Sequence, residues 1–149
     1  MLLREILTSE PFWGATSRGA LTKSPVDLIV GSLRTFEVEV KDGTVLGQVG
    51  QRLGQDLLSP PNVKGWPGGR RWISTQTLLA RHEIMLRFVD RALKGGRLEV
   101  RDWLGLSGAR AMEKAQKVLL PFEPVRSVGA RLNNDALSQL VLDPAYQLK

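Results

Sequence analysis

The chain has 149 residues, enough for one domain with an ordinary apolar core, and we expect a single domain over residues 1–149. Hydrophobic residues make up 42% and charged residues 24%, which excludes wholesale disorder, while the lack of cysteine and the single histidine, His82, exclude disulfides, thiol catalysis and multi-histidine metal sites. Lysine and arginine number 21 against 15 aspartates and glutamates, so the formal net charge is +6.

The first third of the chain predicts two helices joined by a loop. Apolar residues at helical spacing indicate a short opening helix: Leu3, Ile6 and Leu7. Residues 11–19 are typical of a loop or a single turn of helix. Ser24 then supplies an N-cap and Asp27 completes a capping box, so a helix is expected over about 24–35.

The middle of the chain predicts two more helices. Residues 37–41 alternate as a strand does, but no partner strand follows, and helical spacing returns over 44–54. Ser74 caps the clearest helix, expected over 75–94. One apolar stripe of that helix is expected to face the core: Leu78, Leu79, His82, Met85, Leu86, Val89 and Leu93.

The last third predicts further helical segments. A short helix is expected within 98–106, a second helix is capped by Ser107 and stopped by Pro121, and a last helix is expected over 135–142. Asn133 or Asn134 caps this last helix. The expected fold is therefore all-α, a compact, bundle-like array of about five helices.

One long loop interrupts the helical pattern at residues 55–73, with three prolines and three glycines between Pro60 and Gly69. Loops of this length inside a compact domain are uncommon and often functional. Its apolar residues are expected to pin it to the core: Val63, Trp66 and Trp72. Trp66, between a glycine and a proline, is the one of these least expected to be buried.

The positive charge gathers on this loop and on the helix that follows. No acid lies between Asp56 and Glu83, whereas this stretch carries four cations: Lys64, Arg70, Arg71 and Arg81. Backbone N–H groups ahead of the helix start at Ser74 add a natural anion site. We call residues 59–72 the basic loop and expect its ligand-binding residues to be Asn62, Lys64, Trp66, Arg70 and Arg71. The competing interpretation is that the arginines pair with acids from elsewhere or lie in solvent.

The sequence gives little support for metal binding, catalysis or nucleotide binding. His82-Glu83 begins an H-E-x-x-H pattern, but Leu86 stands where the second histidine belongs, so no metal site is expected. A hydrogen-bonded core histidine is the preferred interpretation of His82, and a catalytic base would need a hydroxyl such as that of Ser59 or Ser74 nearby. Nucleophile elbows and standard phosphate-binding loops are absent, so we assign no catalytic residue and no cofactor.

The sequence also argues against specific nucleic-acid binding and against a membrane span. The basic residues of 81–101 alternate with acids, which is typical of a salt-bridged helix face and not of specific nucleic-acid recognition. No run of about 18 apolar residues is present, so no membrane-spanning helix is expected. The first residues lack the pattern of a signal peptide, and the chain itself does not fix a compartment.

Five segments in particular carry a family resemblance: residues 7–13, 23–31, 59–69, 77–81 and 143–147. The third, Ser-Pro-Pro-Asn-Val-Lys-Gly-Trp-Pro-Gly-Gly, is the most specific. With these segments the chain resembles the C-terminal part of a bacterial family, domain of unknown function 1800. The resemblance implies a mostly helical fold and a parent protein several times longer, of which this chain is about the last third. It also implies that many members are exported, to the periplasm or beyond, and it carries no established activity.

Three functions follow as hypotheses. In the first, the chain is a non-catalytic C-terminal module of an exported protein. Its basic loop binds an anionic ligand, another protein or the preceding region of its own parent. In the second, His82 and the loop form half of a hydrolase site that this preceding region completes. In the third, the loop is structural. Exposed apolar residues on the first helix would indicate a surface made for a partner.

Overall fold

The computed structural model describes residues 1–95 and 109–149, and within these ranges the fold is all-α. The helices, in chain order, are α1 (Leu2–Thr8), α2 (Glu10–Trp13), α3 (Pro25–Thr35), α4 (Gly43–Arg52), α5 (Thr75–Lys94), α6 (Ala109–Leu119) and α7 (Asn134–Leu142), with 3-10 helices η1 (Gly69–Trp72) and η2 (Pro144–Gln147). The predicted helix within 98–106 and the Ser107 cap lie outside the described residues.

The helix starts follow the caps that the sequence provides. Ser24 and Asp27 form the predicted capping box of α3, and Ser74 forms one with Thr77 at the start of α5. Asn133 caps α7. Asp42, which reads as a turn signal, is instead the N-cap of α4 and accepts a hydrogen bond from the Thr44 N–H at 2.8 Å. The alternating residues just before it form no strand.

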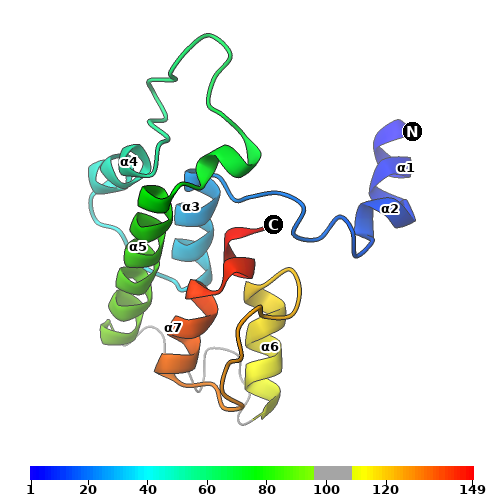
Figure 1. Ribbon diagram of the computed structural model, residues 1–149, viewed down its shortest axis with the longest axis vertical. Helices are drawn as coiled ribbons and strands as arrows, with labels where there is room; N and C mark the ends of the chain where they lie inside the picture. The colour runs from blue at the N-terminus through cyan, green and yellow to red at the C-terminus, as the bar shows by residue number, and fades with distance from the viewer. Residues whose placement is uncertain (96–108) are drawn as a thin grey trace.

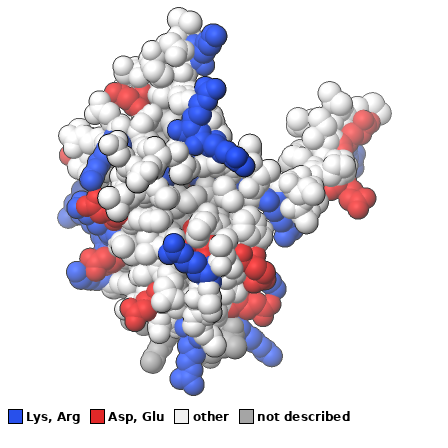
Figure 2. Space-filling model, in the orientation of Figure 1, with Lys and Arg blue, Asp and Glu red and all other residues white. Residues whose placement is uncertain are grey.

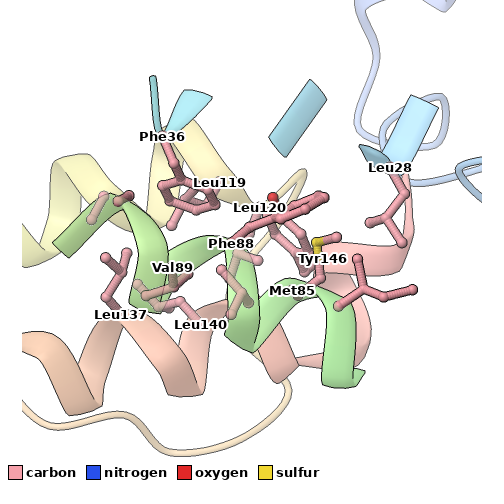
Figure 3. Packing of buried hydrophobic residues seen from close by; sticks show 14 of the residues in the cluster. Leu28, Phe36, Met85, Phe88, Val89, Leu119, Leu120, Leu137, Leu140 and Tyr146 are labelled. Carbon is pink, nitrogen blue, oxygen red and sulfur yellow. The ribbon is translucent and has the colours of Figure 1, made fainter. Parts of the chain in front are cut away.

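The core lies between α5 and α7, which run side by side, with α3 and α6 on their flanks (Figure 1). Figure 3 shows Val89 of α5 next to Leu137 and Leu140 of α7. All three side chains are buried, because α5 presents one face to both α3 and α7. Burial of this contiguous apolar surface is the main source of stability for the fold.

The predicted apolar stripe of α5 is wrong at its edge. Leu79 and Leu86 are exposed, whereas Arg81, Ile84 and Phe88 are buried. The two exposed leucines are seven residues apart, so they form one ridge on the outer side of the helix. The buried arc is rotated toward Arg81 because α3 and α7 enclose that side.

The N-terminal arm, residues 1–13, stands apart from the rest of the molecule (Figure 1). Its helices α1 and α2 pack against each other, and neither contains a buried residue. The leucines and isoleucine of the first helix are therefore exposed, as a surface made for a partner would require. No helix of the described residues is long and apolar enough to cross a membrane.

Candidate anion-binding loop and a buried cation cluster

The basic loop lies between α4 and α5, and part of it extends away from the helical body (Figure 1). Asn62 forms a turn within the loop. Its side-chain oxygen accepts a hydrogen bond from the Lys64 N–H at 2.9 Å, and its backbone carbonyl accepts one from the Gly65 N–H at 3.0 Å. Trp72 is buried and anchors the end of the loop, as predicted. Val63 is fully exposed, so the prediction that it pins the loop is wrong.

The cations of the basic loop are exposed and unpaired. Lys64, Arg70 and Arg71 are all solvent-exposed, and none forms an ion pair or a side-chain hydrogen bond with any residue that the structure describes. Figure 2 shows blue side chains near the top of the view, over the part of the loop that leads into α5. Because no acid of the described ranges neutralises them, their positive charge is available to a partner.

Trp66 lies between the cations along the chain and is half-buried. Its indole Nε1 is shielded from solvent and has no hydrogen-bond partner among the described residues. Buried donors normally find an acceptor, and an unsatisfied one costs about 1–3 kcal/mol. The loop therefore holds a donor that a small shift of the loop, or a partner, can satisfy.

His82 lies at the edge of the core and not in its centre. It is half-buried and lines a shallow hollow at the start of α5 together with Ser74 and Thr75. Burial, and then the charge of Arg126, lower the pKa of His82, so the imidazole is neutral at pH 7. The prediction of a hydrogen-bonded core histidine is wrong, since no hydrogen bond to it is found among the described residues. Ser59 does not line this hollow.

Ser74 is not positioned to serve as the nucleophile of this histidine. Its hydroxyl accepts the Thr77 N–H at 3.2 Å and lies 3.1 Å from the Thr77 hydroxyl, both within the capping box. The hollow is thus lined by the neutral imidazole of His82 and by two hydroxyl residues, Ser74 and Thr75. Within the described ranges, neither hydroxyl is hydrogen-bonded to His82. Among the described residues, no group of three or more histidines, cysteines or carboxylates is arranged to hold a metal ion.

Sequence reasoning missed a cluster that consists of a pair of cations in the body of the molecule: Arg81, which is buried, and Lys23, which is partly buried. Arg81 is completely buried; its Nη1 donates to the Gln147 side-chain oxygen at 3.2 Å and its Nη2 to the Lys23 carbonyl at 3.0 Å. The Nε of Arg81 and the Nε2 of Gln147 have no partner among the described residues. Burial lowers the pKa of Arg81 to about 10.

Lys23 is the second cation of this cluster. Its Nζ donates to the Tyr146 carbonyl at 2.8 Å and lies 4.1 Å from the centre of the Tyr146 ring, a cation–π contact. Burial lowers the pKa of Lys23 to about 8; the charge of Asp27 opposes this, and those of Arg81 and Lys149 add to it. Arg81 therefore does not belong to the surface charge of the loop, as the sequence suggested, but to the interior.

The cluster also joins distant parts of the chain. It brings together three of the segments that carry the family resemblance: residues 23–31, 77–81 and 143–147. Asp143, in the last of these, is completely buried and accepts hydrogen bonds from the backbone N–H groups of Val125, Arg126 and Ala145 at 2.8–3.2 Å. The signal for Arg81 was its spacing, four residues before Met85 and seven before Phe88, which places it on the buried face.

Comparison with known proteins gives one match. A family model described as "Protein of unknown function (DUF1800)" matches residues 1–148, which is nearly the whole chain. No curated protein and no solved structure matches the chain.

Proposed function

The chain belongs to the DUF1800 family, whose description assigns no function, and we propose that it is a non-catalytic interaction module that binds a negatively charged partner surface through the basic loop. In this proposal Lys64, Arg70 and Arg71 supply the charge and Trp66 supplies contact area. Asn62 holds the turn that presents Lys64.

One observation carries the proposal: the three loop cations are exposed and have no acidic partner among the described residues. Two exposed cations of α5 provide the contrast, since Arg87 and Lys94 each pair with an acid one turn earlier, at 2.6 and 2.9 Å. A paired cation contributes little to steering an anionic partner, whereas a group of unpaired cations attracts one over about 8–10 Å at physiological salt.

Two neighbouring features support the same function. Arg70 and Arg71 lie in η1, which leads directly into α5, so the positive end of a 20-residue helix adds to their field. Trp66 is half-buried, so the exposed part of its ring adds aromatic contact area within the same loop. Tryptophan and arginine are the residues that most often dominate binding at protein interfaces.

The test compares two double variants of equal charge. We expect Arg70→Ala/Arg71→Ala to weaken binding to polyglutamate about tenfold, because two unpaired cations are lost at the contact. Arg87→Ala/Lys94→Ala lowers the net charge by the same amount and is expected to change the affinity less than about twofold. Fluorescence anisotropy over a salt series measures both. Equal losses in the two variants would mean that net charge, and not the loop, determines binding.

We also propose which protein carries the acidic partner surface. The resemblance implies a longer, exported parent, so the partner surface we favour is an acidic region of that parent, or of another protein in the same compartment. Mixing the chain with the separately expressed preceding region tests this. A complex that Arg70→Ala/Arg71→Ala weakens supports it, and a complex that forms equally well with this variant contradicts it.

A hydrolase half-site stays a second candidate because His82 is neutral, half-buried and close to two hydroxyl residues in one hollow. Here the preceding region of the parent supplies the remaining catalytic groups. We expect His82→Gln to abolish ester hydrolysis by the complete parent and to leave polyglutamate binding unchanged. A parent with no hydrolytic activity toward simple esters, or with activity that survives His82→Gln, would reject this candidate.

A further inference from the structure

A small crevice lies on the other side of Lys23, away from the basic loop. Residues of α3 line most of it, together with Tyr146 and the end of α6. The lining residues besides Lys23 are Asp27, Leu28, Gly31, Ser32, Thr35, Val118, Leu119 and Tyr146. Its volume is about 220 Å³. That is below the roughly 300 Å³ of pockets for drug-sized ligands, so it suits a ligand of only a few heavy atoms.

Lys23 is the cation that faces this space. Its ammonium contacts the Tyr146 ring and donates one N–H bond to the Tyr146 carbonyl, and the described residues provide no oxygen acceptor for the other N–H bonds. Burial lowers the pKa of Lys23 most; the charge of Asp27 opposes this, and those of Arg81 and Lys149 add to it. A partly desolvated ammonium with N–H bonds left unpaired is less stable than one whose donors meet an anion.

Asp27 does not offset this charge fully, because it is already engaged. Its carboxylate forms the capping box with Ser24 and pairs with the Lys149 ammonium. The hydroxyls of Ser32 and Tyr146 also bond to each other at 2.7 Å, and Ser32 donates to the sulfur of Met85 at 3.0 Å. Lys23 is therefore the donor that the crevice offers to a ligand.

We propose that this crevice binds a small monocarboxylate with a short apolar tail, whose carboxylate accepts from Lys23. The tail would contact the apolar wall made by Leu28, Val118 and Leu119. A dianionic phosphate fits less well, since its second charge would face Asp27 and it has no apolar part to place against that wall. The binding site is distinct from the basic loop and does not depend on its function.

The test titrates the full chain with butyrate, acetate, inorganic phosphate and butyramide, and follows the ¹³Cε resonance of Lys23. We expect butyrate to bind more tightly than acetate, to raise the pKa of Lys23, and to bind at least about tenfold more tightly than phosphate or butyramide. Tighter binding of phosphate, or a Lys23 resonance that does not respond to butyrate, would overturn the proposal.

Two variants locate the ligand by independent means. Lys23→Met removes the cation and is expected to weaken butyrate binding about tenfold or more. Gly31→Leu keeps every charge and fills the crevice, since a Cβ at Gly31 meets no atom within 4 Å. Circular dichroism confirms that each variant is folded. Arg70→Ala/Arg71→Ala is the control and leaves butyrate binding unchanged. Butyrate affinity that Gly31→Leu does not reduce would place the ligand elsewhere and contradict the proposal.

Discussion

Neighbouring glycines of the basic loop, Gly68 and Gly69, have different backbone conformations. Gly69 has a φ of +60°, in the left-handed region that side chains disfavour, whereas Gly68 has a φ of −102° and an extended backbone. A Cβ on either residue would meet no atom within 4 Å. Glycine is therefore needed at position 69 for its conformation, and at position 68 neither space nor conformation requires it.

This difference predicts opposite effects of one substitution. Gly69→Ala should lower the free energy of unfolding by about 1 kcal/mol, because alanine is strained at positive φ. Gly68→Ala should be neutral or stabilise by up to about 0.5 kcal/mol, because it restricts the unfolded chain. Urea denaturation measures both. Equal effects of the two substitutions would show that the two backbone conformations do not differ as described.

Lys23 makes the stability of the fold depend on pH at the alkaline end. Its pKa is about 8 in the folded protein and near 10.5 in the unfolded chain, so between these values the unfolded chain binds more protons. Stability from this group therefore rises with pH over that window. Tyr146 acts in the opposite direction above pH 10, since burial raises its pKa to about 12.

The prediction is made on the difference between the wild type and Lys23→Met. From pH 8 to pH 10 the free energy of unfolding of the wild type should increase relative to this variant by about 2 kcal/mol. Tyr146 contributes little below pH 10, because its folded-state pKa of about 12 lies above this window. Urea denaturation at several pH values provides the data. A difference that stays constant or decreases with pH would show that Lys23 is not held in a desolvated site.

Residue types alone could not place the two functional groups of α5. Arg81 was counted with the positive charge of the loop and the helix start because no acid is near it in sequence, whereas in the structure backbone and amide acceptors take the place of an acid. His82 was assigned to the core from an apolar stripe that is rotated in the structure. Both errors have one cause: the packing of α3 and α7, which sequence periodicity does not contain, decides which side of α5 is buried.

At the scale of elements, the helices were the predictable part. Caps and apolar spacing predicted the starts and approximate ends of α3, α5 and α7, because these signals are local in sequence. The basic loop was also predicted to be irregular from its prolines and glycines. The short helix η1 was missed, since its four residues carry no apolar period and depend on the burial of Trp72.

The N-terminal arm offers a test at this scale. Because no residue of α1 or α2 is buried, deleting residues 1–13 should change the melting temperature of the remaining chain by less than about 2 °C. Leu137→Ala, in the core, is the contrast and should cost about 2–5 kcal/mol. Differential scanning calorimetry measures both. A large loss on deletion of residues 1–13 would mean that the arm packs onto the body.

At the scale of the whole molecule, the cations behind the net charge of +6 include three groups with different roles. Some cations pair with acids on helix surfaces, as Arg87 and Lys94 do, and contribute little. Arg81 is buried and Lys23 partly buried, and both join the C-terminal segment to the body. The cations of the basic loop have no acidic partner among the described residues and lie within eight residues of one another in sequence, and our account assigns recognition of the anionic partner to them.

The most direct test of this claim is an amide NMR titration of the ¹⁵N-labelled chain with polyglutamate at low and at high salt. We predict shift changes within residues 62–72 and the first turn of α5, which are lost at high salt because the contact is electrostatic. Resonances of the core of α7 should not move. Shift changes centred outside the basic loop, or none at low salt, would contradict the account.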